Sequence, residues 1–182
     1  MACILSGIQA NAQSVNFDLK TSPNVDFVFN TIDKCVNGII KPHALELNVN
    51  VTGAQWDLYI GSTTTVAGSW NVLSSYSTSG ITPPPSNILQ VRVYNGSNTP
   101  LTGGGFFPIS DIGAPTYVIG SAGNDPAVNC ADAIPIGTNQ PGDYSSDPSC
   151  YRFRVDLKLV PGLIYRPGFY SLRVDYVLIE DL

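Results

Sequence analysis

Residues 150–182 read CYRFRVDLKLVPGLIYRPGFYSLRVDYVLIEDL, and this stretch indicates the fold of the chain. Apolar side chains occupy every second position in 151–159 and again in 170–178. Such period-two alternation is typical of β-strands that bury one face. Between the two stretches, Pro167 and Gly168 fit the two central positions of a type II turn. The stretch therefore predicts a long antiparallel ribbon with one core face.

The same alternation recurs through the rest of the chain, and no long window shows apolar residues at helical spacing. Further strands are expected at 15–19, 25–29, 45–51, 56–60, 70–76, 89–93 and 116–120. The third and fourth of these stretches read as a hairpin, and Trp56, Trp70, Val72 and Tyr76 fall on the inward phase of their strands. Roughly seven to nine strands with frequent turns predict an all-β fold, an immunoglobulin-like antiparallel β-sandwich.

Composition restricts the function classes. Only 13% of the residues are charged, the formal net charge is −5, and lysine and arginine form no cluster. Nucleic acids and anionic membranes need basic surfaces, so neither is an expected partner. No apolar run reaches the length that spans a membrane.

The N-terminus resembles an export signal. Residues 1–12 combine a short apolar run with Ala10-Asn11-Ala12, a small-x-small pattern that signal peptidase recognises, although no lysine or arginine precedes Lys20. We expect a signal peptide remnant at 1–12 and a mature start at Gln13; the alternative is a buried strand at 4–8. Export would place the protein outside the cell or on its surface.

The cysteines fit an oxidising compartment. Loss of Cys3 with the signal leaves an odd number, Cys35, Cys130 and Cys150. Cys130 and Cys150 flank a loop rich in proline, glycine, aspartate and serine, and we expect a disulfide between them. Cys35 is then a buried thiol or pairs between subunits.

Few residues point to catalysis. His43 is the single histidine of the chain, so neither a Ser-His-Asp triad nor a multi-histidine metal site is easy to build. Asp143 and Asp147 are the nearest approach to a glycosidase pair or a weak calcium loop, but aspartates are common in solvated turns and that interpretation is favoured. Trp56 and Trp70 are expected in the core rather than against sugar rings. We expect no enzyme, no cofactor and no metal.

The C-terminal strand raises the question of what covers its edge. Exposed strand edges invite aggregation, and proteins commonly protect them with charge or proline. From Leu172 to Ile179 the strand carries only Arg173 and Asp175 as charges. The alternating arm at 13–22, which ends before Pro23, has the properties of a strand that completes a sheet.

At this point the sequence resembles a family. WDLYIGS (56–62), the terminal hairpin LIYRPGFYSLRVDYVLIEDL (163–182) and a signal followed by an alternating arm are similar to pilin-like subunits of the spore-coat-U and chaperone–usher superfamily. The resemblance implies a sandwich (23–182) that lacks one strand, completed by the N-terminal arm (13–22) of the next subunit. It further implies an extracellular fibre made by a Gram-negative-type bacterium.

The resemblance also implies site residues and partners. Val15, Phe17 and Leu19 would be the donor-strand residues, and the acceptor groove would be lined by Tyr170, Leu172, Val174, Tyr176 and Leu178. The main partner would be a second copy of the chain, with a periplasmic chaperone and an outer-membrane usher assisting assembly.

The alternative function is a monomeric cell-surface adhesin module that binds carbohydrate or protein. A β-sandwich hydrolase or lyase is a third class, for which no acid–base cluster is found.

Overall fold

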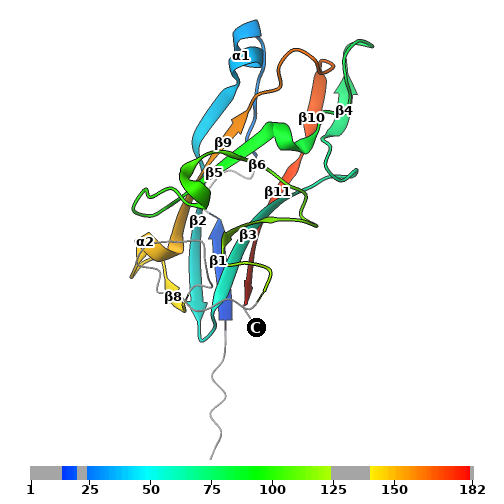
Figure 1. Ribbon diagram of the computed structural model, residues 1–182. Helices are drawn as coiled ribbons and strands as arrows, with labels where there is room; N and C mark the ends of the chain where they lie inside the picture. The colour runs from blue at the N-terminus through cyan, green and yellow to red at the C-terminus, as the bar shows by residue number, and fades with distance from the viewer. Residues whose placement is uncertain (1–13, 20–23, 124–139, 181–182) are drawn as a thin grey trace, which may run out of the picture.

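The computed structural model describes residues 14–19, 24–123 and 140–180 (Figure 1). As predicted, the fold is all-β, antiparallel and sandwich-like, with immunoglobulin-like character. The described strands are β1 (Ser14–Leu19), β2 (Ile39–Thr52), β3 (Trp56–Thr63), β4 (Asn71–Ser75), β5 (Leu89–Asn95), β6 (Phe107–Pro108), β7 (Thr116–Ile119), β8 (Gly142–Asp143), β9 (Arg152–Leu159), β10 (Gly168–Ser171) and β11 (Arg173–Glu180). The helical elements are short: α1 (Ile32–Asn37), α2 (Pro148–Tyr151) and the 3-10 turns η1 (Ser86–Ile88) and η2 (Thr102–Gly104).

The strands form two main sheets and a small third one. The first sheet has the order β1-β2-β9-β5-β6, with β8 also paired to β2, and the second has the order β11-β3-β7. The third sheet contains only β10 and β4, which extend beyond the larger sheets at the upper right of Figure 1. All strand pairs in these sheets are antiparallel.

The core lies between the first and second sheets. Trp56 of β3 is fully buried and packs edge-on against Phe153 of β9, with ring centroids 6.2 Å apart. Its indole Nε1 donates a hydrogen bond to the Gln140 carbonyl at 2.9 Å. The prediction that Trp56 is a core residue is therefore confirmed.

The predicted C-terminal ribbon is wrong in its pairing. β9 pairs with β2 and β5, whereas β11 pairs with β3 in the other sheet. With β9 and β11 in different sheets, the apolar faces of both strands point into the core between the sheets. The predicted turn is also wrong: Gly168 begins β10 opposite Ser75, and the left-handed glycine of this connection is Gly162, with φ +67°.

The predicted hairpin of β2 and β3 is likewise absent from the described sheets. β2 belongs to the first sheet and β3 to the second, so the chain crosses the sandwich between Thr52 and Trp56. Gly53 has φ +75° at this crossing, a conformation that glycine adopts without a steric penalty. A period-two pattern says that a strand has a buried face, but not which strand lies beside it.

β4 departs from the prediction in its burial. Val72 and Tyr76, expected to point into the core, are exposed. The cause is the position of β4, which pairs with β10 beyond the two main sheets. Trp70, just before β4, is half-buried and does pack against the core.

Within the described residues, no helix is long and apolar enough to cross a membrane.

Candidate functional site at the open edge of the sandwich

One lateral edge of the sandwich lies between β2 of the first sheet and β11 of the second. β11 pairs with β3 along its whole length, from Arg173 opposite Thr63 to Glu180 opposite Trp56. Among the described strands, none pairs with the other edge of β11. This free edge belongs to the C-terminal strand, in which the sequence places few of the charges that commonly protect an exposed edge.

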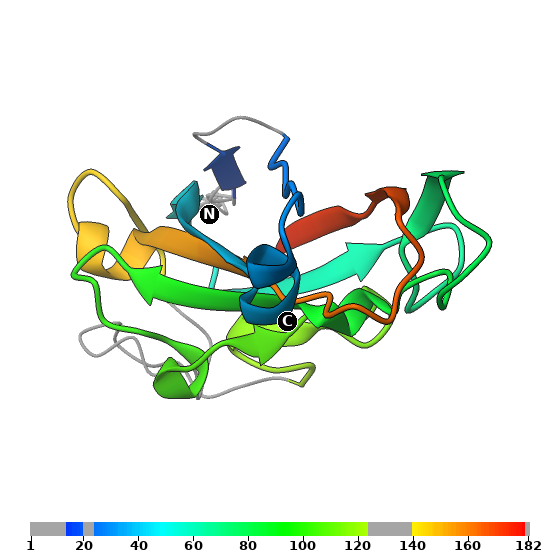
Figure 2. The same cartoon turned by 90° about the horizontal axis from the view of Figure 1, so that it is seen from above.

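The N-terminal strand lies at this edge. β1 pairs with β2 and also comes within 8 Å of β11, measured between Cα atoms. Figure 2 shows the blue N-terminal residues between β2 and the red C-terminal strands. The arm therefore covers the open edge of its own sandwich, with a hydrogen-bonded ladder to β2 alone.

The register of β1 matches the inward phase of β2. Val15, Phe17 and Leu19 stand opposite Val51, Val49 and Leu47, whose side chains are all buried. Directly paired residues share one face of a sheet, so Phe17 lies on the face of Val49. Phe17 nevertheless keeps 37% of its surface exposed, so the arm fills this position only in part.

Four of the five predicted groove residues lie together. Leu172, Val174, Tyr176 and Leu178 are half-buried and pack against the core. The fifth, Tyr170, lies in β10 opposite Val72 of β4. Its hydroxyl donates to the Arg166 carbonyl at 2.5 Å, which places it in the β10–β4 sheet and away from the open edge.

Tyr176 carries a polar group into this region. Its hydroxyl is buried and has no hydrogen-bond partner in the described part of the chain. Burial raises the pKa of Tyr176 well above its usual range, because the charged phenolate is poorly solvated there. The phenol is therefore neutral, and its O–H is a buried hydrogen-bond donor without an acceptor among the described residues.

Residues 24–30 are a second N-terminal segment that packs against the core, and the prediction of a strand at 25–29 is wrong. The expected strand at 25–29 is absent: residues 24–30 have no regular secondary structure and pair with no strand of the described sheets. Val25, Phe27 and Phe29 pack against the core, while the residues between them are exposed. The rings of Phe27 and Phe29 lie parallel, 6.5 Å apart between centroids. We call 24–30 the plug, because its apolar side chains pack against the core while the segment belongs to none of the described sheets.

The candidate catalytic residues serve local structure. Asp143 accepts hydrogen bonds from the backbone N–H groups of Ser145 and Ser146 and from both of their hydroxyls. These bonds hold the pKa of Asp143 well below its usual range. Asp147 precedes α2, where its carboxylate accepts from the Ser149 hydroxyl. Both aspartates organise the turn from β8 to α2.

His43 marks an irregularity in β2. It has φ +46° at a register shift between Lys41 and Leu45, and its side chain is exposed. Its backbone N–H donates to Asp156 at 2.8 Å. Across 14–19, 24–123 and 140–180, no three His, Cys, Asp or Glu side chains gather as a metal site would require.

The cysteines follow the prediction in part. Cys150 is buried and disulfide-bonded, and Cys35 in α1 is a half-buried free thiol. Cys130, the predicted partner of Cys150, lies outside the described residues, so that pairing stays a prediction. The expected signal at 1–12 and the mature start at Gln13 lie outside them as well.

Comparison with known proteins gave no family. The protein-family models and the curated proteins searched with this chain returned no match.

Proposed function

We propose that this chain is a structural subunit of an extracellular pilus-like fibre, joined to its neighbours by donor-strand exchange. In the fibre, β1 of one subunit pairs with β2 of the next and covers its open edge. The observation that carries the proposal is the place of β1: the N-terminal strand of the described chain covers the one gap between β2 and β11.

Exchange between copies follows from the geometry of that cover. A β1 strand from a second copy can make the same ladder with β2 that the chain makes with itself. Swapping an identical element between protomers is a low-cost route to assembly, because the strand finds the same hydrogen bonds and packing in the neighbour as in its own subunit. In the proposed fibre the interface is head-to-tail, and repeated head-to-tail exchange whose rotation does not close into a ring gives a filament.

The arm covers the open edge of its own sandwich only in part. Phe17 is partly exposed, the free edge of β11 has no ladder, and the Tyr176 hydroxyl lacks a partner among the described residues. An arm in another copy, free to approach without the connection at 20–23, can adjust its position along the edge. The incomplete burial of Phe17, the unpaired edge of β11 and the unpartnered Tyr176 hydroxyl support the proposal that the arm is exchanged between subunits.

The rest of the proposal follows the resemblance to pilin-like subunits. The subunit is exported by a Gram-negative-type bacterium, and a periplasmic chaperone and an outer-membrane usher assist its assembly. The low charge and the acidic balance suit a protein–protein polymer better than a nucleic-acid partner.

A second candidate function is a monomeric binding module at the cell surface. The arm pairs with its own β2 in the structure, which is the arrangement expected of a self-contained domain. A fibre subunit would instead have an arm that is unpaired or swapped when the subunit is isolated. The two candidates therefore differ in whether the arm leaves its own sandwich.

The deciding experiment is electron microscopy of material sheared from cells and of the purified chain. We expect filaments in which the strand 14–19 runs into the sandwich of the neighbouring subunit. Deletion of the arm before Ser22 should abolish the filaments. Discrete monomers with a self-paired arm, or filaments that persist without the arm, would contradict strand exchange.

A pair of point variants tests the face of the arm. Phe17→Asp places a charge on the face shared with buried Val49, whereas Asn16→Asp adds the same charge at an exposed position. Because burying an unpaired charge costs several kcal/mol, we expect Phe17→Asp to block assembly. Filament length under the microscope is the readout, and equal assembly by both variants would show that Phe17 does not enter a neighbour.

A further inference from the structure

The apolar face of the β1–β2 ladder does not by itself fix the register of the arm. Phe17 stands opposite Val49, and every residue of β2 on that face from Leu45 to Val51 is apolar and buried. A slip of the arm by one residue would turn its apolar residues to the other face. A slip by two residues would instead keep apolar residues opposite apolar residues. Another feature of the ladder must therefore distinguish the observed register from the registers two residues away.

The opposite face of the ladder carries charged residues. Asp18 is exposed and stands opposite Asn48, which in turn stands opposite Arg152 of β9. Directly paired residues share one face of a sheet, so these three form a row across β1, β2 and β9. The Arg152 side chain leans over β2, because its Nε donates to the side-chain oxygen of Asn48 at 3.3 Å. The observed register thus places the one carboxylate of β1 in the row that contains this guanidinium.

The next row of this face contains a carboxylate. Glu46 stands opposite Arg154, and its two oxygens lie 3.6 Å from Nε of Arg154 and of Arg152. Two guanidinium groups therefore share one carboxylate, which leaves a positive charge that the carboxylate of Asp18 offsets. A two-residue slip in this direction would set Asp18 directly opposite Glu46. Like charges directly opposite each other destabilise a strand pair.

The row on the other side is also unfavourable for a carboxylate. There Asn50 of β2 stands opposite Asp143 of β8. A two-residue slip in this second direction would move Asp18 opposite Asn50 and into the row of Asp143. The carboxylate of the arm would then exchange the row of a guanidinium for the row of another carboxylate.

We infer that Asp18 determines the register in which β2 binds the arm. Its carboxylate favours the row of Arg152 and opposes a two-residue slip in either direction. The edge of β2 therefore selects an alternating strand in which a carboxylate directly follows the central apolar residue, as Asp18 follows Phe17. For an arm donated by a second copy, this inference rests on the proposed function. For the self-paired arm of the structure it does not.

Disulfide trapping in the full chain reads the register directly. Ser14 and Thr52 are paired in the structure, so Ser14→Cys with Thr52→Cys should join in the observed register. Ser14→Cys with Asn50→Cys should join only after a two-residue slip toward Glu46. Directly paired residues of antiparallel strands have Cα atoms about 4.5 to 5.5 Å apart, a separation that a disulfide can span. Both pairs are made with Cys35→Ser, which removes the free thiol of α1.

Charge reversal at residue 18 should change which disulfide forms. With Asp18 present, we expect the 14–52 disulfide to predominate after mild oxidation. Asp18→Lys places a lysine in the row of Arg152, and the slip would bring that lysine opposite Glu46. The ratio of the 14–52 to the 14–50 disulfide should therefore fall about tenfold. Mass spectrometry of the digested protein identifies the joined cysteines.

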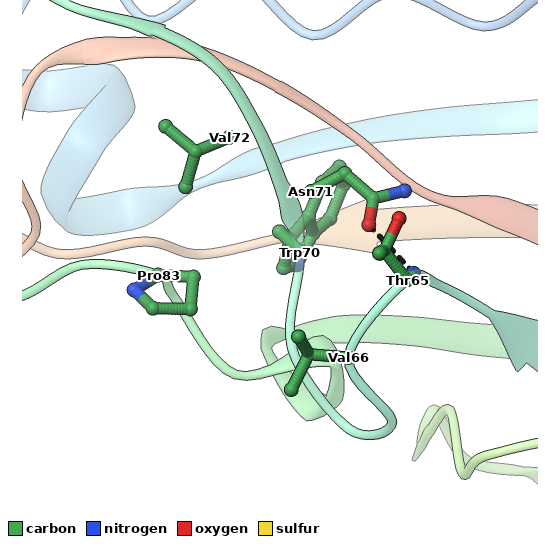
Figure 3. Close-up of a pocket in the computed structure, with 6 residues that line it drawn as sticks. All are labelled: Thr65, Val66, Trp70, Asn71, Val72 and Pro83. Atoms are coloured by element: carbon green, nitrogen blue, oxygen red, sulfur yellow. Dashed lines mark hydrogen bonds between the residues drawn. The ribbon is translucent and has the colours of Figure 1, made fainter.

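Two control variants add a lysine elsewhere. Asn16→Lys changes an exposed residue on the same face of the arm, in the row of Asn50 and Asp143, and should keep the observed register. Val66→Lys raises the net charge at an exposed residue near β4, at the other end of the molecule from the start of β1 (Figure 1). It should leave the ratio of the disulfides unchanged. Val66 lines a cavity of about 270 Å³ together with Thr65, Trp70, Asn71, Val72 and Pro83 (Figure 3).

Three outcomes would overturn the inference. The first is an unchanged ratio in Asp18→Lys, which would show that packing of the apolar face sets the register. The second is an equal fall of the ratio in either lysine control. The third is loss of both disulfides in Asp18→Lys, because the slipped register should then be the better one. A denaturing gel of the same samples shows whether each disulfide joins one chain or two, which tests strand exchange, so the two proposals fail separately.

Discussion

Asp156 lies on the outward phase of β9, yet only 3% of it is exposed. Its carboxylate accepts from the backbone N–H of His43 and from Arg92 Nη2, both at 2.8 Å. The Arg92 guanidinium in turn lies over the ring of Phe106, 4.3 Å from its centroid. Asp156 thus satisfies the irregular backbone of β2 and joins β2, β9 and β5. The sequence pattern placed it with surface residues because the irregularity that buries it is not encoded in β9.

This arrangement predicts a large effect of Asp156→Ala. Removing one partner of a buried, hydrogen-bonded ion pair typically costs about 3 kcal/mol or more, and Arg92 and the His43 N–H would both lose their acceptor. Glu46→Ala is the control, because Glu46 lies 3.6 Å from Arg152 and Arg154 in partly exposed ion pairs. Such pairs contribute less than about 1 kcal/mol. Urea denaturation of both variants measures the difference, and similar free energies of unfolding would contradict the role of Asp156.

The β2–β3 connection decides how the elements divide between the sheets. With only Gly53, Ala54 and Gln55 between Thr52 and Trp56, the chain passes from the first sheet to the second. The two strands then turn their apolar faces toward each other across the core, which a hairpin in one sheet would not allow. The left-handed backbone of Gly53 reverses the direction of the chain at this crossing.

Gly53→Ala should therefore destabilise the fold. A residue with a Cβ atom loses about 1 to 2 kcal/mol in the left-handed conformation. Gly105→Ala is the matched control, since Gly105 has φ −99° and a Cβ atom there would meet no atom within 4 Å. Thermal unfolding should show a lower midpoint for Gly53→Ala alone. An unchanged midpoint would mean that the crossing can adopt another turn.

At the scale of the whole molecule, the open edge between β2 and β11 is covered by two N-terminal segments of different character. β1 has a ladder with β2 and an exposed phenylalanine, whereas the plug at 24–30 has no ladder and three half-buried apolar side chains. We expect the plug to stay in its own sandwich when β1 is exchanged. The exchanged unit is then β1 alone, and α1, which follows the plug, stays with its subunit.

A matched pair of phenylalanine truncations measures the difference between the segments. Phe27→Ala should lower the free energy of unfolding of the monomer by about 2 kcal/mol, below the 3 to 5 kcal/mol of a fully buried phenylalanine. Phe17→Ala should change it by less than about 1 kcal/mol, because Phe17 is already partly exposed in the monomer. Denaturant titrations of the monomeric protein give both values. Equal losses would show that β1 and the plug are held alike.

The sequence by itself determined that this chain is built of strands, and it located most of them. Alternation in 151–159, 56–60 and 89–93 corresponds to β9, β3 and β5, because a period of two places every second side chain on one face and apolar residues bury that face. It also indicated that Trp56 is in the core and that the N-terminal arm is a strand able to cover an edge.

Only the tertiary structure decided which strands are neighbours. The alternating pattern of β11 suits pairing with β9 as well as with β3, since a buried face does not name the strand beside it. The tertiary structure also decides whether a segment with that pattern joins a sheet. β1 pairs with the edge of β2, whereas 25–29 only packs its apolar side chains against the core. The cavity at Trp70 likewise exists because residues distant in sequence, Thr65 and Pro83, meet there. Pairing and cavities depend on interactions between distant residues, and such interactions leave no period in the sequence.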